Sequence, residues 1–154
     1  MTGKVEKRLA EAGVELPQAP APAANYVPYT ISGNLLVISG QVTLGPNGIE
    51  YVGKLGHDTD VETGQAAARL CAINILAQAR AALGDLDRIT KVLKIQGFVN
   101  STPDFTEHPS VINGASDFLV EILGETGKHA RAAVGMSSLP LGVAVEIDAM
   151  IEFK

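Results

Sequence analysis

The sequence has few of the residues that build metal, disulfide or nucleic acid sites. The single cysteine, Cys71, excludes an intramolecular disulfide, and the three histidines are scattered without the spacing of metal ligands. Aspartate and glutamate (17) outnumber lysine and arginine (12), so a net charge of −5 offers no positive field for a phosphate backbone. These shortages argue against a zinc site and against nucleic acid as a partner.

Long apolar runs and phosphate-binding motifs are missing as well. No stretch approaches the ~18 consecutive apolar residues of a membrane-spanning helix, so we expect no membrane partner. Charged residues follow Met1 where a signal peptide would have its apolar core, which predicts a cytoplasmic protein. Neither the dinucleotide-binding pattern GxGxxG nor the P-loop pattern occurs, and Ser39 lacks the flanking glycines of a nucleophile elbow.

The length of 154 residues, of which 46% are hydrophobic, fits one domain. Residues 2–12 show the spacing of a weak amphipathic helix that ends at Gly13, and prolines interleaved with alanines follow as far as Pro28. Proline has no amide hydrogen to donate to a sheet, so this segment is typical of an extended arm. We therefore predict a surface helix and arm over 1–25 and one compact domain over 26–154.

The compact part shows strand patterns interrupted by two helix patterns. Strands are predicted at 34–39, 89–100, 130–136 and 143–153, with a hairpin at 41–52. One helix starts at a capping box, in which Thr59 is the cap and Glu62 its partner, and stops at Gly84. The other starts at Pro109 and stops before Gly124. This order predicts an α+β fold in which both helices cover one face of a mixed sheet.

Side-chain patterns predict which faces are buried. The short apolar run at 34–39 suits a strand buried on both faces, and Cys71 suits an inert, buried position in the first long helix. The last strand alternates: its odd residues from Val143 to Phe153 are apolar or small, while its even residues include acidic ones such as Glu146. The even face must therefore meet either water or another subunit.

One arginine is notable because its neighbours are small and apolar. Arg131 lies in the run 130–135, and Glu146 follows 15 residues later, in the strand that we expect to pair with it across the turn 138–142. A structural cross-strand ion pair would explain both residues. Alternatively, Arg131 holds a substrate carboxylate in a bidentate fork while Glu146 moves a proton. Spacing alone leaves both interpretations open.

Four segments, taken together, carry a family resemblance. They are HARAAVGMSSLP at 129–140, VAVEIDA at 143–149, VISGQ at 37–41 and the pair Pro28-Tyr29. They resemble the C-terminal signature, the early strand and the active-site tyrosine of the Rid family, the reactive intermediate (imine/enamine) deaminases also called YjgF or L-PSP proteins. The likeness covers about residues 26–153, so the N-terminal helix and arm indicate a longer subgroup.

The resemblance implies a chorismate-mutase-like fold of the bacillus type, assembled as a homotrimer with active sites between subunits. It implies that Arg131 binds the carboxylate of a 2-imino acid and that Glu146 activates the attacking water. Tyr29, Gly40 and Asn113 would line the substrate site, and no metal or organic cofactor is expected. The implied reaction is hydrolysis of 2-imino or 2-enamino acids, such as 2-aminoacrylate, to 2-keto acids and ammonia.

Departures from the family and competing functions keep several hypotheses open. Some members have a cysteine where this chain has Ala133, and its absence removes a covalent or redox role but not the hydrolytic one. Gly97-Phe98 stand where residues that shape the substrate site are expected. A trimer that only binds small carboxylates would need Arg131 but not Glu146. A subunit staple made of these two residues would need no ligand. The L-PSP name also carries an endoribonuclease label, which the net charge of −5 argues against.

Overall fold

A computed structural model gives the structure of residues 3–19 and 25–154. The helices are α1 (Lys4–Glu11), α2 (Val61–Leu83) and α3 (His108–Leu123), with 3₁₀ turns η1 (Leu86–Arg88), η2 (Gly124–Gly127) and η3 (Pro140–Gly142). The strands are β1 (Tyr29–Ser32), β2 (Leu35–Gln41), β3 (Leu44–Gly45), β4 (Gly48–Ile49), β5 (Ile89–Asn100), β6 (Ala130–Met136) and β7 (Val145–Phe153). The predicted order of elements is confirmed, and β1 is an additional strand ahead of it.

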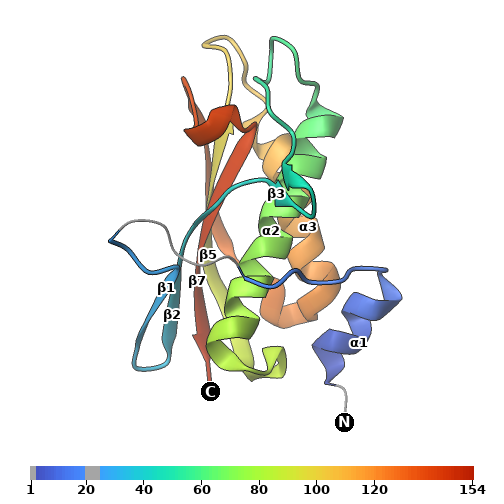
Figure 1. Cartoon of the computed structure of the whole chain (residues 1–154), viewed down its shortest axis with the longest axis vertical. Coiled ribbons are helices and arrows are strands. Elements are labelled where there is room, and N and C mark those ends of the chain that lie inside the picture. The colour runs from blue at the N-terminus through green and yellow to red at the C-terminus, as the bar shows by residue number, and fades with distance from the viewer. Residues whose placement is uncertain (1–2, 20–24) are drawn as a thin grey trace.

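Both long helices cover the same face of a five-stranded sheet, as predicted (Figure 1). Their apolar stripes pack on alternate side chains of the strands, and Phe118 and Leu119 of α3 are fully or almost fully buried there. The backbones of the two helices approach closely at Gly114 of α3. A Cβ at this position would overlap the carbonyl oxygen of Gln65 on α2. Among the described residues, no helix lies on the opposite face of the sheet, which exposes Met150 and other apolar side chains.

The strand order is β1-β2-β7-β5-β6, in which only the pair β5 and β6 is parallel. The helix α3 forms the crossover from β5 to β6, and such a connection places its two strands side by side and parallel. The twelve-residue strand β5 therefore pairs with β6 on one edge and β7 on the other. The prediction that the strands of Arg131 and Glu146 pair directly is wrong, because β5 lies between them.

Local details also correct the sequence predictions. Asp60, and not Thr59, caps α2: its Oδ1 accepts a hydrogen bond from the Thr63 amide at 2.8 Å, because the helix begins one residue later than the predicted capping box requires. Strand β2 alternates between buried and exposed side chains, since helices cover only one face of the sheet. The predicted hairpin at 41–52 is present but its paired strands, β3 and β4, are only two residues each.

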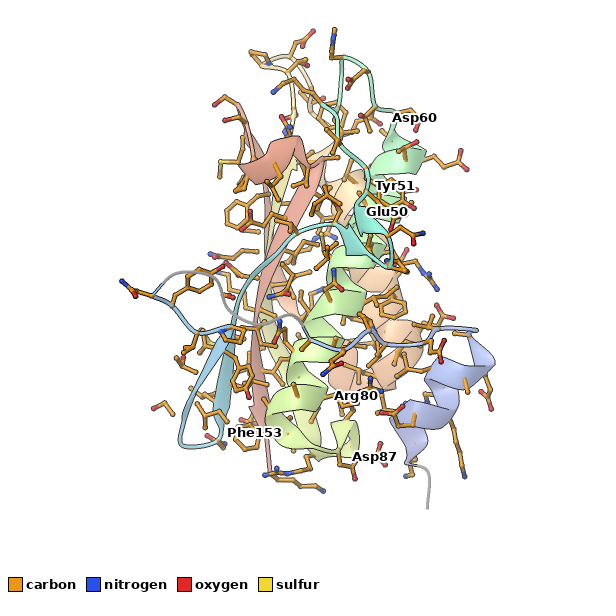
Figure 2. All side chains as sticks on the ribbon, viewed as in Figure 1. Glu50, Tyr51, Asp60, Arg80, Asp87 and Phe153 are labelled. Carbon is orange, nitrogen blue, oxygen red and sulfur yellow. The ribbon has the colours of Figure 1, made fainter. Side chains whose placement is uncertain are left out.

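The N-terminal helix α1 is amphipathic, as predicted, and lies on the surface with its apolar side packed into the domain. Val5 and Leu9 are buried in the common core, and α1 contacts α3 and η1. Asp87 of η1 holds its first turn by accepting hydrogen bonds from the amides of Lys4 at 2.8 Å and Val5 at 2.9 Å (Figure 2). These two bonds hold the pKa of Asp87 below its ordinary value. The predicted arm falls partly on 20–24, outside the described residues.

We expect Asp87→Ala to loosen α1 from the domain, at a cost of about 0.5–2 kcal/mol, because two amides lose their acceptor. Amides of α1 should exchange with solvent faster, while those of α2 stay protected. Since the pKa of Asp87 is lowered, its stabilisation is present at neutral pH and is lost as the pH falls through that lowered pKa. The control is Glu11→Ala at the other end of α1. Equal hydrogen exchange in both variants would contradict the role of Asp87.

Candidate active site

Arg131 is fixed against α3 by three neutral acceptors. Its Nη1 donates to Asn113 Oδ1 at 2.8 Å and to Ser116 Oγ at 3.0 Å, and its Nη2 donates to the carbonyl oxygen of Pro109 at 3.2 Å. Within the described residues, no carboxylate lies at ion-pair distance from this guanidinium. The Nε–H and one Nη2–H have no protein partner there, so two guanidinium donors remain for a carboxylate.

His129 holds Ser116 in turn. The Ser116 Oγ lies 2.8 Å from His129 Nε2, and His129 Nδ1 lies 2.6 Å from the carbonyl oxygen of Gly127. Because a carbonyl only accepts, we assign the ring proton to Nδ1, so that Nε2 of the neutral ring accepts from the Ser116 hydroxyl. The Ser116 oxygen then points a lone pair at Arg131. We call Arg131, Asn113, Ser116 and His129 the arginine cluster.

Glu146 lies over a bulge in β2. The pairing of β2 with β7 holds as far as Ile38 and resumes at Gln41, so Ser39 and Gly40 are accommodated as a bulge. A Cβ on Gly40 would overlap Glu146 Oε2, so only glycine leaves room for the carboxylate in this position. The structure therefore brings together two of the predicted site residues, Gly40 and Glu146.

The surroundings of Glu146 disfavour its charged form. Partial burial raises the pKa of its carboxyl, and the nearby charge of Asp148 raises that pKa further. Burial also raises the pKa of Asp148, against a hydrogen bond from the backbone of Gln96 and the charge of Lys94, which lower it. A carboxyl with a raised pKa is suited to moving a proton near neutral pH.

Tyr29 lies beside the same bulge, at the start of β1. Ser39 donates to the carbonyl oxygen of Pro28 from both its amide and its hydroxyl, each at 3.0 Å, which holds the Pro28-Tyr29 segment next to Gly40. The Tyr29 ring is half-buried against the core. Tyr29 pairs in register with the buried Ile38, so its ring lies on the helix-covered face of the sheet. We call Gly40, Glu146 and Asp148 the glutamate cluster.

The arginine cluster and the glutamate cluster thus lie on opposite faces of the sheet, with Tyr29 on the helix-covered face. In β7 the buried neighbours of Glu146 face the helices, so Glu146 itself faces the uncovered side. In contrast, Arg131 pairs in register with the buried Ile95 and reaches under α3 to Asn113. The hypothesis of an Arg131–Glu146 ion pair within one chain is therefore wrong, because strand order and face both separate the two side chains.

Three members of the clusters were missed from the sequence. Ser116 lies three residues after Asn113 on one face of α3, and Asp148 lies two residues after Glu146 on one face of β7. His129 lies two residues before Arg131, at the entrance to β6. The helical spacing of three and the strand spacing of two were available signals, because both place side chains on the same face.

Comparisons with known proteins place the chain in a family. The family description "YjgF/chorismate_mutase-like, putative endoribonuclease" matches residues 6–152. The chain belongs to this YjgF family. Protein TCP17 of Trypanosoma cruzi is 50% identical over 154 residues, which cover 99% of this chain and 96% of TCP17. That match covers 99% of this chain and so includes the sequence of α1.

Solved structures of similar proteins agree with the fold. The crystal structure of Atu1372 from Agrobacterium tumefaciens has a TM-score of 0.92 and 55% identity, covering 97% of this chain and 92% of that one. Escherichia coli TdcF, solved with bound serine, has a TM-score of 0.65 and 25% identity, covering 89% of this chain and 94% of TdcF. The YjgF chain therefore has the mixed α+β, chorismate-mutase-like fold predicted from the resemblance.

Other candidate chemistry contributes little to the site. Cys71 is fully buried, and that burial raises the pKa of its thiol, which confirms the predicted buried position. In the described ranges, no group of three or more His, Cys, Asp or Glu residues could hold a metal ion. No helix in those ranges is long and apolar enough to cross a membrane.

We expect the Glu146 carboxyl to titrate above the ordinary range of glutamate, as followed by carbon-detected NMR. Asp148→Asn should lower the midpoint only partly, because burial is the larger cause and persists. The folded protein should lose stability as the pH rises from the ordinary to the raised pKa. Glu146→Gln should reduce that slope, and the raised pKa of Asp148 should maintain the rest. The control, Glu152→Gln on the same strand, should leave the Glu146 midpoint unchanged. A midpoint at or below the ordinary range would contradict the described environment.

Proposed function

We propose that this YjgF protein hydrolyses small 2-imino or 2-enamino acids, such as 2-aminoacrylate, to 2-keto acids and ammonia. The observation that carries the proposal is the pair of free donors on Arg131, a guanidinium without a carboxylate partner among the described residues. Its relative TdcF was solved with bound serine, which has the carboxylate and the C2 nitrogen of a 2-imino acid.

The arginine cluster would bind and orient the substrate. The Nε–H and the free Nη2–H of Arg131 would donate two parallel hydrogen bonds to the carboxylate, which fixes the position of the neighbouring imine carbon. The Oδ1 of Asn113 accepts a hydrogen bond from Arg131, so the Asn113 amide nitrogen is available to donate to the ligand. Ser116 and His129 would keep the guanidinium from turning away.

The glutamate cluster would move protons during hydrolysis. The Glu146 carboxylate would accept a proton from water as the water oxygen adds to the C=N carbon, and the imine nitrogen would be protonated to give a carbinolamine. The hydroxyl proton then passes to nitrogen as the C–N bond breaks, which leaves the C=O of a 2-keto acid and releases ammonia. The raised pKa of Glu146 favours such two-way transfer.

The two clusters would meet between copies of the chain. A contact that joins the arginine cluster of one copy to the glutamate cluster of the next is heterologous, and such contacts form a ring when the rotation between copies closes. We propose a homotrimer, in which the uncovered sheet face becomes an interface. Exposed apolar side chains on that face support this proposal, namely Val37, Val134 and Met150.

A trimer that binds small carboxylates without turnover is the alternative. It would use the arginine cluster in the same way and would leave the Glu146 carboxyl without a chemical task. The decisive assay generates 2-aminoacrylate with a pyridoxal-phosphate dehydratase and follows keto-acid release with and without this protein. Faster release supports the deaminase, and unchanged release supports the binding protein.

We expect Glu146→Gln to slow deamination by roughly 10²–10⁴-fold with little change in 2-ketobutyrate affinity, because the amide keeps the shape but does not take a proton. The Glu152→Gln variant serves as the matched control and should retain full turnover. Near-normal turnover in Glu146→Gln would limit Glu146 to a structural role.

We expect Arg131→Lys to lose both turnover and 2-ketobutyrate affinity, because an ammonium has the charge but not the two parallel donors of a guanidinium. The control Arg80→Lys changes an arginine that pairs with Glu6 near α1 and should behave like the wild type. Preserved 2-ketobutyrate affinity in Arg131→Lys would show that charge alone suffices and would refute the bidentate hydrogen bonding of the carboxylate.

A further inference from the structure

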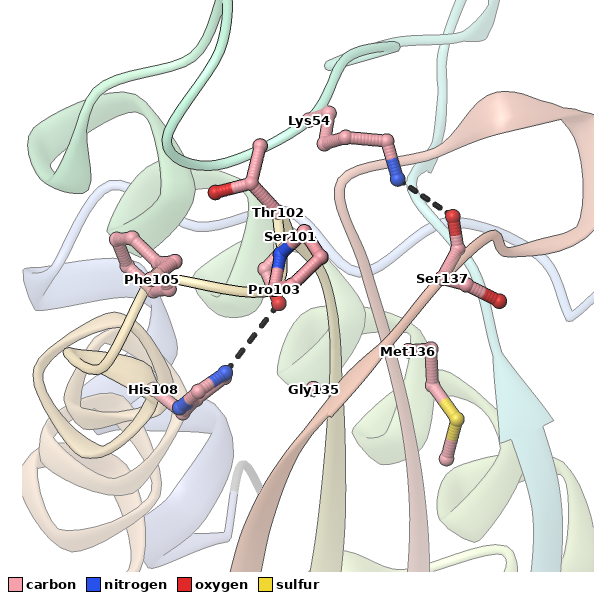
Figure 3. A pocket seen from close by; sticks show the side chains of 9 residues that line it. All are labelled: Lys54, Ser101, Thr102, Pro103, Phe105, His108, Gly135, Met136 and Ser137. Atoms are coloured by element: carbon pink, nitrogen blue, oxygen red, sulfur yellow. Dashed lines mark hydrogen bonds between the residues drawn. The ribbon is translucent and has the colours of Figure 1, made fainter.

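A cavity lies at the end of the sheet where β5 and β6 finish. None of the residues of the arginine and glutamate clusters lines it. It has a volume of about 430 Å³. Its walls come from the loop before α2, the segment between β5 and α3, and the end of β6 (Figure 3). The lining residues used below are Lys54, Ser101, Phe105, His108, Gly135 and Met136.

Lys54 brings a positive charge to this cavity, and two neutral oxygens hold it there. Its Nζ donates to Asn100 Oδ1 at 2.7 Å and to the carbonyl oxygen of Ser137 at 2.5 Å. In the part of the chain that the structure describes, no carboxylate lies at ion-pair distance from this ammonium. The nearby Asp58 instead accepts from the backbone amide of Lys54, at 2.7 Å. The third Nζ hydrogen of Lys54 is therefore available to a ligand.

The opposite wall contains a serine and a histidine at the start of α3. Ser101 Oγ lies 3.2 Å from His108 Nε2, and Ser101 is almost fully buried (Figure 3). The first turn of α3 has no side-chain cap, so its amide hydrogens add positive potential near His108. Thr102 is not a further donor to a ligand, because its hydroxyl is donated to Asp104 at 2.7 Å.

Apolar surface lies between these two polar walls. The Phe105 ring packs edge-on against His108, with 5.2 Å between ring centroids, and Met136 and Pro103 also line the cavity. The floor depends on Gly135, where a Cβ would come within 2.6 Å of His108 Nε2 and 2.7 Å of Ser101 Oγ. The cavity therefore joins the Lys54 cation to a small apolar chamber, and an added methyl group at Gly135 would displace His108 and Ser101 in its wall.

We propose that this cavity binds a small organic carboxylate with an apolar body, whose carboxylate meets Lys54 and whose body lies between Phe105 and Met136. A cation without a counter-ion beside apolar walls favours an amphiphilic anion over a fully polar one such as phosphate. The site is independent of the proposed deaminase, because Arg131, Asn113 and Glu146 do not line it.

The test is an NMR titration of the full chain with benzoate at constant ionic strength, following the Met136 methyl and the His108 ring. We expect saturable shifts at both groups, and at least tenfold weaker binding of neutral benzamide and of inorganic phosphate. Lys54→Gln should weaken benzoate binding at least tenfold, while Lys91→Gln, the same charge change at an exposed position of β5, should not. Thermal melting of each variant checks its fold.

Gly135→Ala tests the shape of the cavity separately from its charge. It leaves Lys54 in place but displaces His108 and Ser101 in the cavity wall, so benzoate affinity should also fall at least tenfold. Three results would overturn the proposal: no saturable shift at Met136, unchanged affinity in folded Lys54→Gln, or shifts that centre on Asn113. The last result would assign benzoate to the arginine cluster. Equal binding of phosphate and benzoate would overturn the apolar part of the site.

Discussion

The crossover from β5 through α3 to β6 determines where the candidate side chains lie. It makes β6 parallel to β5 and leaves β5 between Arg131 and Glu146. It also places α3 directly over Arg131, so that neutral Asn113 and Ser116, and no carboxylate of the protein, accept hydrogen bonds from the guanidinium. Because its partners are neutral, the guanidinium keeps its charge for a ligand. The β5–α3–β6 connection thus separates the two clusters and also positions the guanidinium of the arginine cluster.

The uncovered sheet face is the second consequence of this arrangement. With helices on only one side, the even residues of β7 and their neighbours face outward together. The partial burial of Glu146 and its closeness to Asp148 already raise the pKa of Glu146 in a single chain. A covering subunit would bury both carboxyls more deeply and raise these pKa values further. Association and proton chemistry are therefore linked in the proposed trimer.

The sequence predicted the elements better than their pairing. Periodicity and capping signals located β5, α3, β6 and β7 closely, since those signals are local. The partner of β6 is a long-range property, and the short turn before β7 suggested the wrong neighbour. Arg131 was found because it is unusual among small residues, whereas Ser116 and His129 look ordinary until the fold places them beneath it. The Lys54 cavity joins three distant segments that have no common motif.

The central claim is that one active site takes its arginine from one copy and its glutamate from another. Co-expression of Arg131→Lys and Glu146→Gln chains with different tags, followed by purification through both tags, yields mixed oligomers. Each variant alone should be inactive. Every trimer that carries both tags has one contact of three at which both intact residues meet, so the mixed oligomers should recover roughly a third of wild-type deamination. Mixed oligomers as inactive as either parent would contradict the shared site.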